Sequence, residues 1–209
     1  AIMADCQNII KTYISTSDQG SWYKKILQAM DDSANSYTHA GRVATYASMF
    51  SLGLGIGKPE ELAAAGLLHD LGLSTVPEKI RDKPESARSK EEQTRYEKHV
   101  DDGLEIIRTR KMILSEGILK MIAQHHENFN GTGYPKGLLG ERISKEAQLL
   151  RLADEFDYLT TIQPGRKRFS PLEAIVDLKQ RAAADPAKQH FDPELVKKLA
   201  SLFEISSAP

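Results

Sequence analysis

The sequence predicts an all-α protein, and two observations carry that prediction. Apolar residues recur at three- and four-residue intervals through most of the chain, as at Val43, Tyr46, Phe50 and Leu54. The chain also lacks an alternating apolar and polar run of convincing strand length, an internal repeat and a low-complexity tract. The expected helices cover residues 21–32, 37–54, 59–71, 92–109, 115–126, 144–161, 171–183 and 192–203.

In the first half of the chain, the helix boundaries follow from glycine, proline and charge. Glycines at 53, 55 and 57 end the second helix. Pro59 with Glu60 and Glu61 starts the third, because proline fits a first helical turn and acidic side chains favour the positive end of the helix dipole. Gly72 stops that helix. Residues 81–92 are charged and contain a proline, so we expect a solvated loop there.

In the second half, one segment is too rich in helix breakers for regular structure. Residues 128–140, NFNGTGYPKGLLG, hold four glycines and a proline and are expected to form a functional loop. Apolar spacing supports the helices on either side of it. The last helix begins with Asp192 as its N-cap and Pro193 at the next position.

Composition bounds the class of protein. The 209 residues are 40% hydrophobic and 27% charged, with a net charge of −1, which is typical of a globular protein. Cys6 is the only cysteine, and no 18-residue apolar run occurs, so a disulfide-stapled or membrane-spanning chain is not expected. Near-neutral charge argues against DNA binding through a basic surface. We expect a cytoplasmic location, an N-terminal extension or linker over residues 1–20 and one domain over residues 21–209.

Histidine is the residue type that points to chemistry. Five of the six histidines lie inside expected helices or at their ends, and helical register places His39, His99 and His125 on apolar faces. Asp154 falls in line with Ala147, Leu150 and Tyr158. An inward carboxylate is costly unless it is paired or bound to a cation.

A lone inward histidine is more often a hydrogen-bonded core residue than a ligand. Imidazoles and carboxylates that converge without a spare Lys or Arg among them favour a metal site instead. The adjacent pair His125 and His126 points about 100° apart on a helix, so both can ligate only at a helix end or toward two ions. The candidate ligands are His39, His69, Asp70, His99, His125, His126 and Asp154.

These residues resemble a known family. YTHAGRV at 37–43, His69-Asp70, His99, HHENFNGTGYPKGLLG and LADEFDYLT occur in the order found in the HD-GYP subgroup of the HD phosphohydrolase superfamily. The resemblance spans about residues 35–200 and implies a helical bundle that hydrolyses cyclic dinucleotides, typically cyclic di-GMP. It also implies that His39, His69, Asp70 and Asp154 hold one metal, and that Asp70 bridges to a second held by His99, His125 and His126. Family members use iron or manganese.

The implied chemistry is consistent with the ligand set. Two cations about 3.5–4 Å apart can share and deprotonate a water and stabilise charge at phosphorus. Asp70 and Tyr134 are the expected catalytic residues, and Gly133, Tyr134, Arg166 and Lys167 are expected to contact substrate. The alternative for Tyr134 is a ring packed inward in a structural turn. For the basic residues 166–168, the alternative is a solvated surface.

Four positions depart from the family pattern. Leu73 stands where a lysine usually meets the substrate phosphate, and losing one such contact costs on the order of 3 kcal/mol in the transition state. Asn35 replaces a glutamate of three-metal members, so two metals are expected. Gln163 and Gly165 replace an arginine and an aromatic residue, which leaves the choice of cyclic dinucleotide open.

Two other functions remain open beside the phosphodiesterase. The first is a metal- and cyclic-dinucleotide-binding signalling module with little turnover, acting through a partner such as a diguanylate cyclase or a sensory domain. The second is an HD-type phosphohydrolase acting on a nucleotide monophosphate or alarmone. A homodimer is a further expectation.

Overall fold

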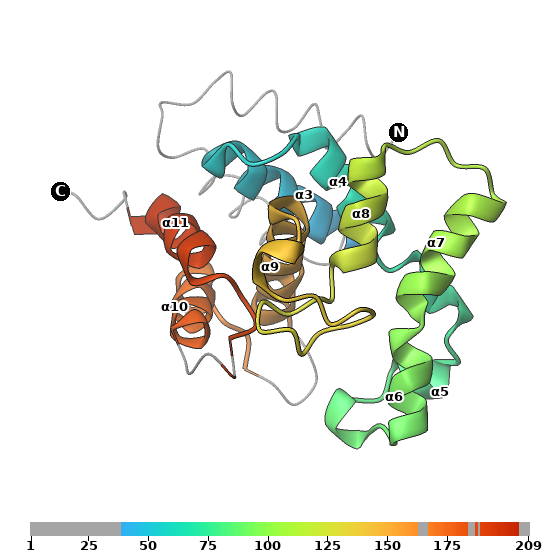
Figure 1. The fold of residues 1–209 in the computed structure, drawn as a ribbon. Coiled ribbons are helices and arrows are strands. Elements are labelled where there is room, and N and C mark those ends of the chain that lie inside the picture. Colours follow the sequence, from blue (N-terminus) through green and yellow to red (C-terminus); the bar gives the residue numbers. More distant parts are fainter. Residues whose placement is uncertain (1–38, 163–166, 184–186, 188, 205–209) are drawn as a thin grey trace.

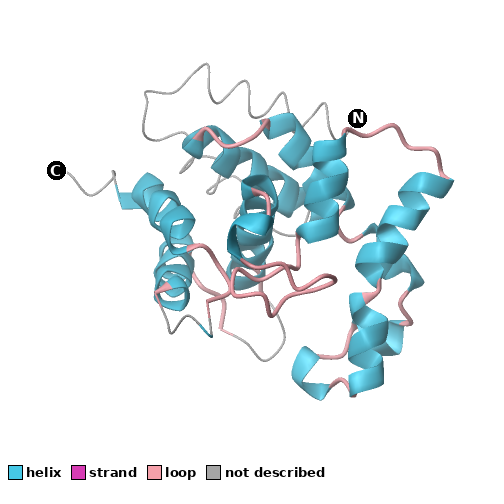
Figure 2. Ribbon diagram, in the orientation of Figure 1, coloured by secondary structure: helices cyan, strands magenta, loops and turns pink. Residues whose placement is uncertain are grey.

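A computed structural model of the chain describes residues 39–162, 167–183, 187 and 189–204, and these form helices joined by loops (Figure 2). The described residues contain an isolated bridge between Asn130 and Leu139 but no named strand, so the all-α prediction is confirmed. The α-helices are α3 (His39–Leu54), α4 (Pro59–Leu68), α5 (Glu78–Arg81), α6 (Lys90–Glu97), α7 (His99–Thr109), α8 (Glu116–Gln124), α9 (Lys145–Thr160), α10 (Pro171–Ala182) and α11 (Pro193–Glu204). The short 3-10 helices are η1 (Leu71–Thr75), η2 (Glu85–Ala87) and η3 (Gly140–Arg142).

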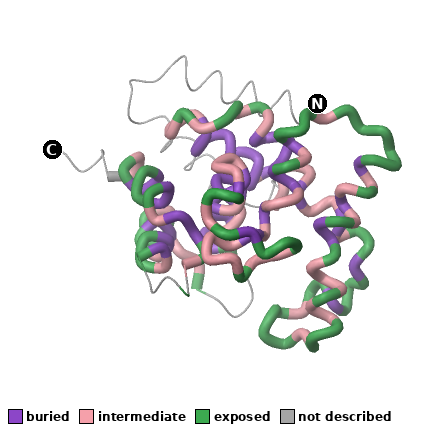
Figure 3. The backbone as a smooth tube through the Cα atoms, in the orientation of Figure 1, coloured by how far each residue is buried: buried purple, intermediate pink, exposed green. Residues whose placement is uncertain are grey.

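Helix α9 lies at the centre of the arrangement (Figure 1). It contacts α3, α8 and α10, while α4 packs on α3 and α8, and α11 packs on α10 and α3. Helix α7 packs against η1 and contacts α6, and these elements lie together on one side of the molecule (Figure 1). Buried segments concentrate where α3, α4 and α9 meet (Figure 3).

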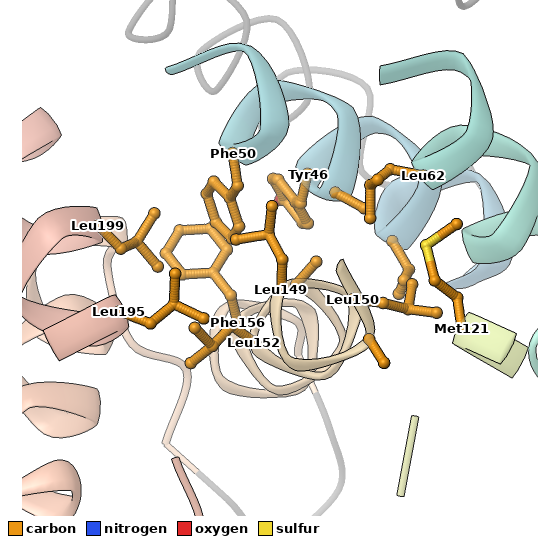
Figure 4. Packing of buried hydrophobic residues seen from close by; sticks show 14 of the residues in the cluster. Tyr46, Phe50, Leu62, Met121, Leu149, Leu150, Leu152, Phe156, Leu195 and Leu199 are labelled. Carbon is orange, nitrogen blue, oxygen red and sulfur yellow. The ribbon is translucent and has the colours of Figure 1, made fainter. Parts of the chain in front are cut away.

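The core is built around aromatic contacts between α3 and α9. Phe156 of α9 meets the rings of Tyr46 and Phe50 edge to face, with centroids 4.9 and 5.6 Å apart (Figure 4). Leu149 and Leu150 fill the space beside them. Each such fully buried side chain contributes about 1.5–3 kcal/mol of apolar burial. The core thereby fixes the direction in which α3 and α9 present their polar residues.

Two glycines let helices approach closely beside the candidate site. A Cβ on Gly66 would lie 2.6 Å from Cα of Ala44, so α4 rests directly on the α3 backbone. A Cβ on Gly72 would lie 1.9 Å from the carbonyl oxygen of His99 and 2.6 Å from the amide of Gly103. Only glycine fits these contacts, of which the first holds α4 against α3 and the second holds η1 against the start of α7 at His99.

The loop prediction for residues 81–92 is wrong in part. The segment contains η2, and α6 begins at Lys90 because Ser89 and Glu92 form a capping box, in which each side chain accepts from the other's backbone N–H. The helix expected over 92–109 is two helices, separated at Lys98. The Asp192 N-cap is confirmed, since its Oδ1 accepts from Glu194 N at 2.9 Å.

The expected helix over 21–32, the boundary near residue 20 and the departures at Asn35, Gln163 and Gly165 lie outside the described residues. Within the described residues, no helix combines the length and the apolar character that a membrane crossing requires.

Candidate metal centre

The candidate ligands lie at the ends of helices, apart from Asp154, which lies within α9. His39 and His99 begin α3 and α7. The helix expected to reach residue 71 ends at Leu68, so His69 and Asp70 occupy the junction between α4 and η1. The helix expected to reach residue 126 ends at Gln124, so His125 and His126 follow α8. At such ends, adjacent side chains can turn toward a common point.

The structure brings the seven predicted ligands together in two groups. The first group is His39, His69 and Asp154, and the second group is Asp70, His99, His125 and His126. Within each group, one nitrogen or oxygen from every residue lies within 4.8 Å of the others. The histidines and Asp154 divide as in the ligand sets that the resemblance implies, but Asp70, expected with the first metal and as a bridge, is grouped with the second.

Asp70 faces both groups. Its Oδ2 lies 3.3 Å from Nε2 of His69 and 3.6 Å from Nε2 of His39. Its Oδ1 lies 3.4 Å from Nε2 of His99 and 3.7 Å from Nε2 of His125. One carboxylate oxygen is therefore directed at each group, as a bridging ligand requires.

Several of these atoms are buried with no hydrogen-bond partner. An unpartnered buried polar atom costs about 1–3 kcal/mol, so a cluster of them requires an explanation. Imidazole nitrogens and carboxylate oxygens are ligands that divalent transition metals accept, and the clusters could hold such ions. The unpartnered atoms are Nε2 of His69, His99, His125 and His126, and Oδ1 of Asp70.

Backbone carbonyls orient three of the histidines. Nδ1 of His69 bonds the carbonyl of Gly66 at 2.8 Å. Nδ1 of His99 and of His125 bond the carbonyls of Tyr96 and Ile122, each at 2.7 Å. A carbonyl only accepts, so Nδ1 carries the proton and donates. The Nε2 lone pairs of His99 and His125 are left facing inward, as metal ligation requires.

Asp157 and Arg42 complete the first group, and sequence reasoning assigned neither of them a role. Asp157, with its side chain 2% exposed, accepts from Nδ1 of His39 at 2.8 Å and from Nε of Arg42 at 2.6 Å. The available signal was spacing: Asp157 follows Asp154 by three residues, and Arg42 follows His39 by three, so each pair shares a helix face.

Three expectations about the surroundings are wrong. Arginines do stand beside the groups, with Arg42 on Asp157 and with Nη1 of Arg151 3.5 Å from Nδ1 of His126. Tyr158, aligned with Asp154 by helical arithmetic, is 46% exposed. The His39 side chain is 40% exposed, because it begins α3 at the rim of the site rather than continuing the apolar stripe.

Burial and neighbouring charge set the ionisation of the site. Burial lowers the pKa of His39, but bonds to Asp154, Asp157 and Asp70 outweigh it and raise the pKa to about 12. Burial raises the pKa of Asp70, but His69, His125 and His39 outweigh it and hold the pKa well below its usual range. Burial lowers the pKa of His125 and of His126. Asp70 is thus anionic and His125 and His126 are neutral, which are the forms that bind cations, whereas His39 is held as a cation and would release a proton on ligation.

The glycine-rich loop folds back onto the second group. The buried Glu127 carboxylate accepts from the backbone N–H of Lys136 and of Leu138, each at 2.8 Å. Gly133 lies so close that its Cβ would meet the amide of Asn128 at 2.2 Å. The ring of Tyr134 stacks on His126 with centroids 4.6 Å apart. The loop is therefore a fixed wall of the site.

The predicted substrate residues differ in how close they lie to the two groups. Tyr134 packs against candidate ligands, which is the inward arrangement weighed as its alternative. Gly133 has a packing role in the loop. Lys167 is exposed and pairs with Glu173 at 3.0 Å rather than with either group. Arg166 lies outside the described residues.

Comparisons with known proteins identify the family of this chain. A family model described as "HD domain" matches residues 24–195. "Cyclic di-GMP phosphodiesterase PA4108" of Pseudomonas aeruginosa is 32% identical over 78% of this chain and 39% of its own length. "3'3'-cGAMP-specific phosphodiesterase 2" of Vibrio cholerae is 33% identical over 77% of this chain and 30% of its own length. This chain therefore spans less than half the length of these curated relatives.

Solved structures share the fold. An HDG"Y"P protein from Bdellovibrio bacteriovorus, Bd1817, is 22% identical with a TM-score of 0.64, over 97% of this chain and 70% of that chain. The HD domain of the L. monocytogenes phosphodiesterase PgpH, solved in complex with cyclic-di-AMP, is 15% identical with a TM-score of 0.57. That match covers 82% of this chain and 91% of the PgpH chain.

Proposed function

The chain belongs to the HD domain family, and we propose that it hydrolyses the phosphodiester bond of a cyclic dinucleotide with the help of two divalent cations. The observation that carries the proposal is that the buried, unpartnered Nε2 atoms of His69, His99 and His125 face the two oxygens of Asp70. The names of the relatives support the reaction and the class of substrate.

Each group would hold one cation. His39, His69 and Asp154 would bind the first, His99, His125 and His126 would bind the second, and Asp70 would bridge them. When bound, such cations lower the pKa of a coordinated water and stabilise negative charge on phosphorus. The chain's own contribution is orientation: the carbonyls of Gly66, Tyr96 and Ile122 and the Asp157 carboxylate hold the rings in place.

We expect the glycine-rich loop beside the second group to contact the substrate. Tyr134, whose ring stacks on that of His126, remains the proposed catalytic partner of Asp70. Gly133, Arg166 and Lys167 remain proposed substrate contacts. A chain with a net charge of −1 can bind an anionic diester because bound cations supply the positive charge.

The finer assignments also stay proposals. Cyclic di-GMP is the preferred substrate because relatives are named for it, and 3'3'-cGAMP is the next choice. Iron or manganese is the preferred metal, since nitrogen-rich ligation without thiolate suits both. A cytoplasmic location, a homodimer and a diguanylate cyclase or sensory partner complete the proposal.

Leu73 favours a second candidate, the weakly catalytic binding module. Leu73 is half-buried in η1, three residues after Asp70, and its backbone N–H donates to the Asp70 carbonyl at 2.9 Å. Its side chain offers no charge to a substrate phosphate. The metal centre would then serve recognition more than turnover.

Turnover of cyclic di-GMP after anaerobic loading with Fe(II) or Mn(II) separates the two functions. Product should form with the wild-type chain and should be absent with Asp70→Ala, which removes the bridge. Cyclic di-GMP binding without product above that control would instead support the binding module.

A further inference from the structure

Arg151 of α9 contacts His126 in a way that the other ligand histidines do not share. Its Nη1 lies 3.5 Å from Nδ1 of His126. A guanidinium has only N–H donors and stays protonated. In this contact, therefore, Nδ1 of His126 must be the acceptor.

At the neighbouring histidine, His125, Nδ1 is a donor instead of an acceptor. Nδ1 of His125 donates to the Ile122 carbonyl, which leaves the His125 Nε2 lone pair facing the second group. A neutral imidazole carries one proton, so an accepting Nδ1 places the His126 proton on Nε2. That Nε2 is buried without a hydrogen-bond partner. His125 and His126 thus favour opposite tautomers.

We propose that Arg151 holds His126 as the Nε2–H tautomer and thereby makes the second group the weaker of the two cation sites. The proposal rests on the metal centre proposed above. Ligation through Nε2 of His126 requires its proton to leave that atom and a proton to be taken up at Nδ1, so the ring's proton count is unchanged. Arg151 must then turn away from an N–H that it repels.

The surroundings give Arg151 somewhere to turn. It lines a small cavity with Glu127, Gln148 and Phe191. Oε1 of Gln148 is buried and without a hydrogen-bond partner, and it could accept from the displaced guanidinium. The Arg151 Cζ lies 5.6 Å from the centroid of the Phe191 ring. This ring can stabilise the guanidinium both before and after it turns away from His126.

The tautomers can be measured in the metal-free chain by long-range proton–nitrogen NMR of the imidazoles. Signals of His126 are identified by their loss in His126→Asn. We expect His126 as Nε2–H and His125 as Nδ1–H, and we expect Arg151→Gln to convert His126 to Nδ1–H because the new carbonyl accepts. His126 found as Nδ1–H or as imidazolium in the wild-type chain would overturn the proposal.

Mn²⁺ titration by calorimetry tests the consequence. Arg151→Gln should tighten the weaker site by about tenfold, the scale of outer-shell effects on metal affinity. Arg151→Lys keeps a donor-only cation and should bind like the wild type. The matched control is Arg181→Gln, because Arg181 faces the same Phe191 ring, with its Cζ 5.2 Å from the centroid, and bonds Glu155 instead of a ligand histidine.

The outcomes distinguish this proposal from the metal centre itself. Two sites of unequal affinity, of which only the weaker tightens in Arg151→Gln, support both. Two sites that Arg151→Gln leaves unchanged or weakens overturn the role of Arg151 and leave the centre standing. A wild-type chain that binds no Mn²⁺ overturns the centre and this proposal together.

Discussion

Asp157 holds His39 by its Nδ1 at 2.8 Å while its other oxygen is bound to Nε of Arg42 at 2.6 Å. His39 begins α3 and Asp157 lies in α9, so this contact joins the two helices at the first group. It directs Nε2 of His39 toward Asp154 and Asp70, at 3.3 and 3.6 Å. Asp157 is therefore a positioning residue for the first cation.

Asp157→Asn should weaken the first site while leaving the second intact. The amide replaces one acceptor oxygen with an NH₂ donor, which must face either Nδ1–H of His39 or the Arg42 guanidinium. Outer-shell changes of this kind cost about 10–100-fold in metal affinity, which Mn²⁺ titration measures. Asp177→Asn, which breaks an Asp–Arg pair on α10 at 2.9 Å, is the control and should bind as the wild type. Equal affinities for both variants would remove the role of Asp157.

Transition-metal ions should raise the melting temperature of the chain. A ligand at 100 times its Kd adds about 2.7 kcal/mol, which corresponds to roughly 5–10 °C for a chain of this size. Mn²⁺ should produce this shift in a thermal melt, and a chelator should reverse it. Ca²⁺ at the same concentration should produce little shift, because it prefers oxygen ligands over imidazole. A larger shift with Ca²⁺ than with Mn²⁺ would argue against histidine ligation.

Gly72→Ala should destabilise the fold and displace His99. The new Cβ would meet the His99 carbonyl and the Gly103 amide, both of them backbone atoms that cannot yield without moving α7. We expect a loss of about 2–3 kcal/mol by urea unfolding. Gly117→Ala is the matched control, because its Cβ meets only side-chain atoms, Oε2 of Glu61 at 3.0 Å and Oγ of Ser115 at 3.6 Å, and it should be neutral or stabilising by up to about 1 kcal/mol. Similar losses in the two variants would show that the Gly72 contact is unimportant.

The N-terminus of α10 should stabilise the chain in a pH-dependent manner through Glu173. The Ser170 backbone N–H and the Lys167 ammonium lower the pKa of Glu173 from 4.5 to about 2. Because the folded pKa is the lower one, the contribution is fully present above about pH 4.5 and is lost as pH falls through 2. The difference in unfolding free energy between wild type and Glu173→Gln should therefore shrink over that window. A difference that stays constant from pH 7 to pH 2 would contradict this account.

Leu73→Lys should raise the rate of cyclic dinucleotide cleavage. A cation added to η1 beside Asp70 could meet the developing negative charge, and one such donor is worth roughly a hundredfold in rate. Steady-state kinetics with cyclic di-GMP measure the gain. Ile113→Lys adds the same charge at a fully exposed position and should leave the rate unchanged. A Leu73→Lys rate no higher than that of the control would place the deficit elsewhere.

Much of the candidate site could be predicted from sequence because its ligands carry their own signals. Histidines in helical register, a following aspartate and an adjacent pair such as His125 and His126 are visible without coordinates. The orienting partners are not, since the acceptor for each Nδ1 depends on which helix end or neighbouring helix lies beside it. Asp157 and Arg151 have ordinary helical positions, and their roles arise only when α9 packs against α3 and the second group.

Two features of the fold could not be predicted from the local sequence. The charged run at residues 81–92 concealed the Ser89 capping box, because the same polar residues suit a loop and a helix start. The direction of the Tyr134 ring depends on the loop folding back onto Glu127, a contact between residues about ten positions apart that spacing alone does not specify.

Anomalous diffraction at the manganese edge from crystals of the Mn²⁺-loaded chain tests the central claim most directly. The account predicts two peaks, one on each side of the Asp70 carboxylate, with His39, His69 and Asp154 around one and His99, His125 and His126 around the other. A peak at one group only, or peaks away from Asp70, would contradict the two-cation centre.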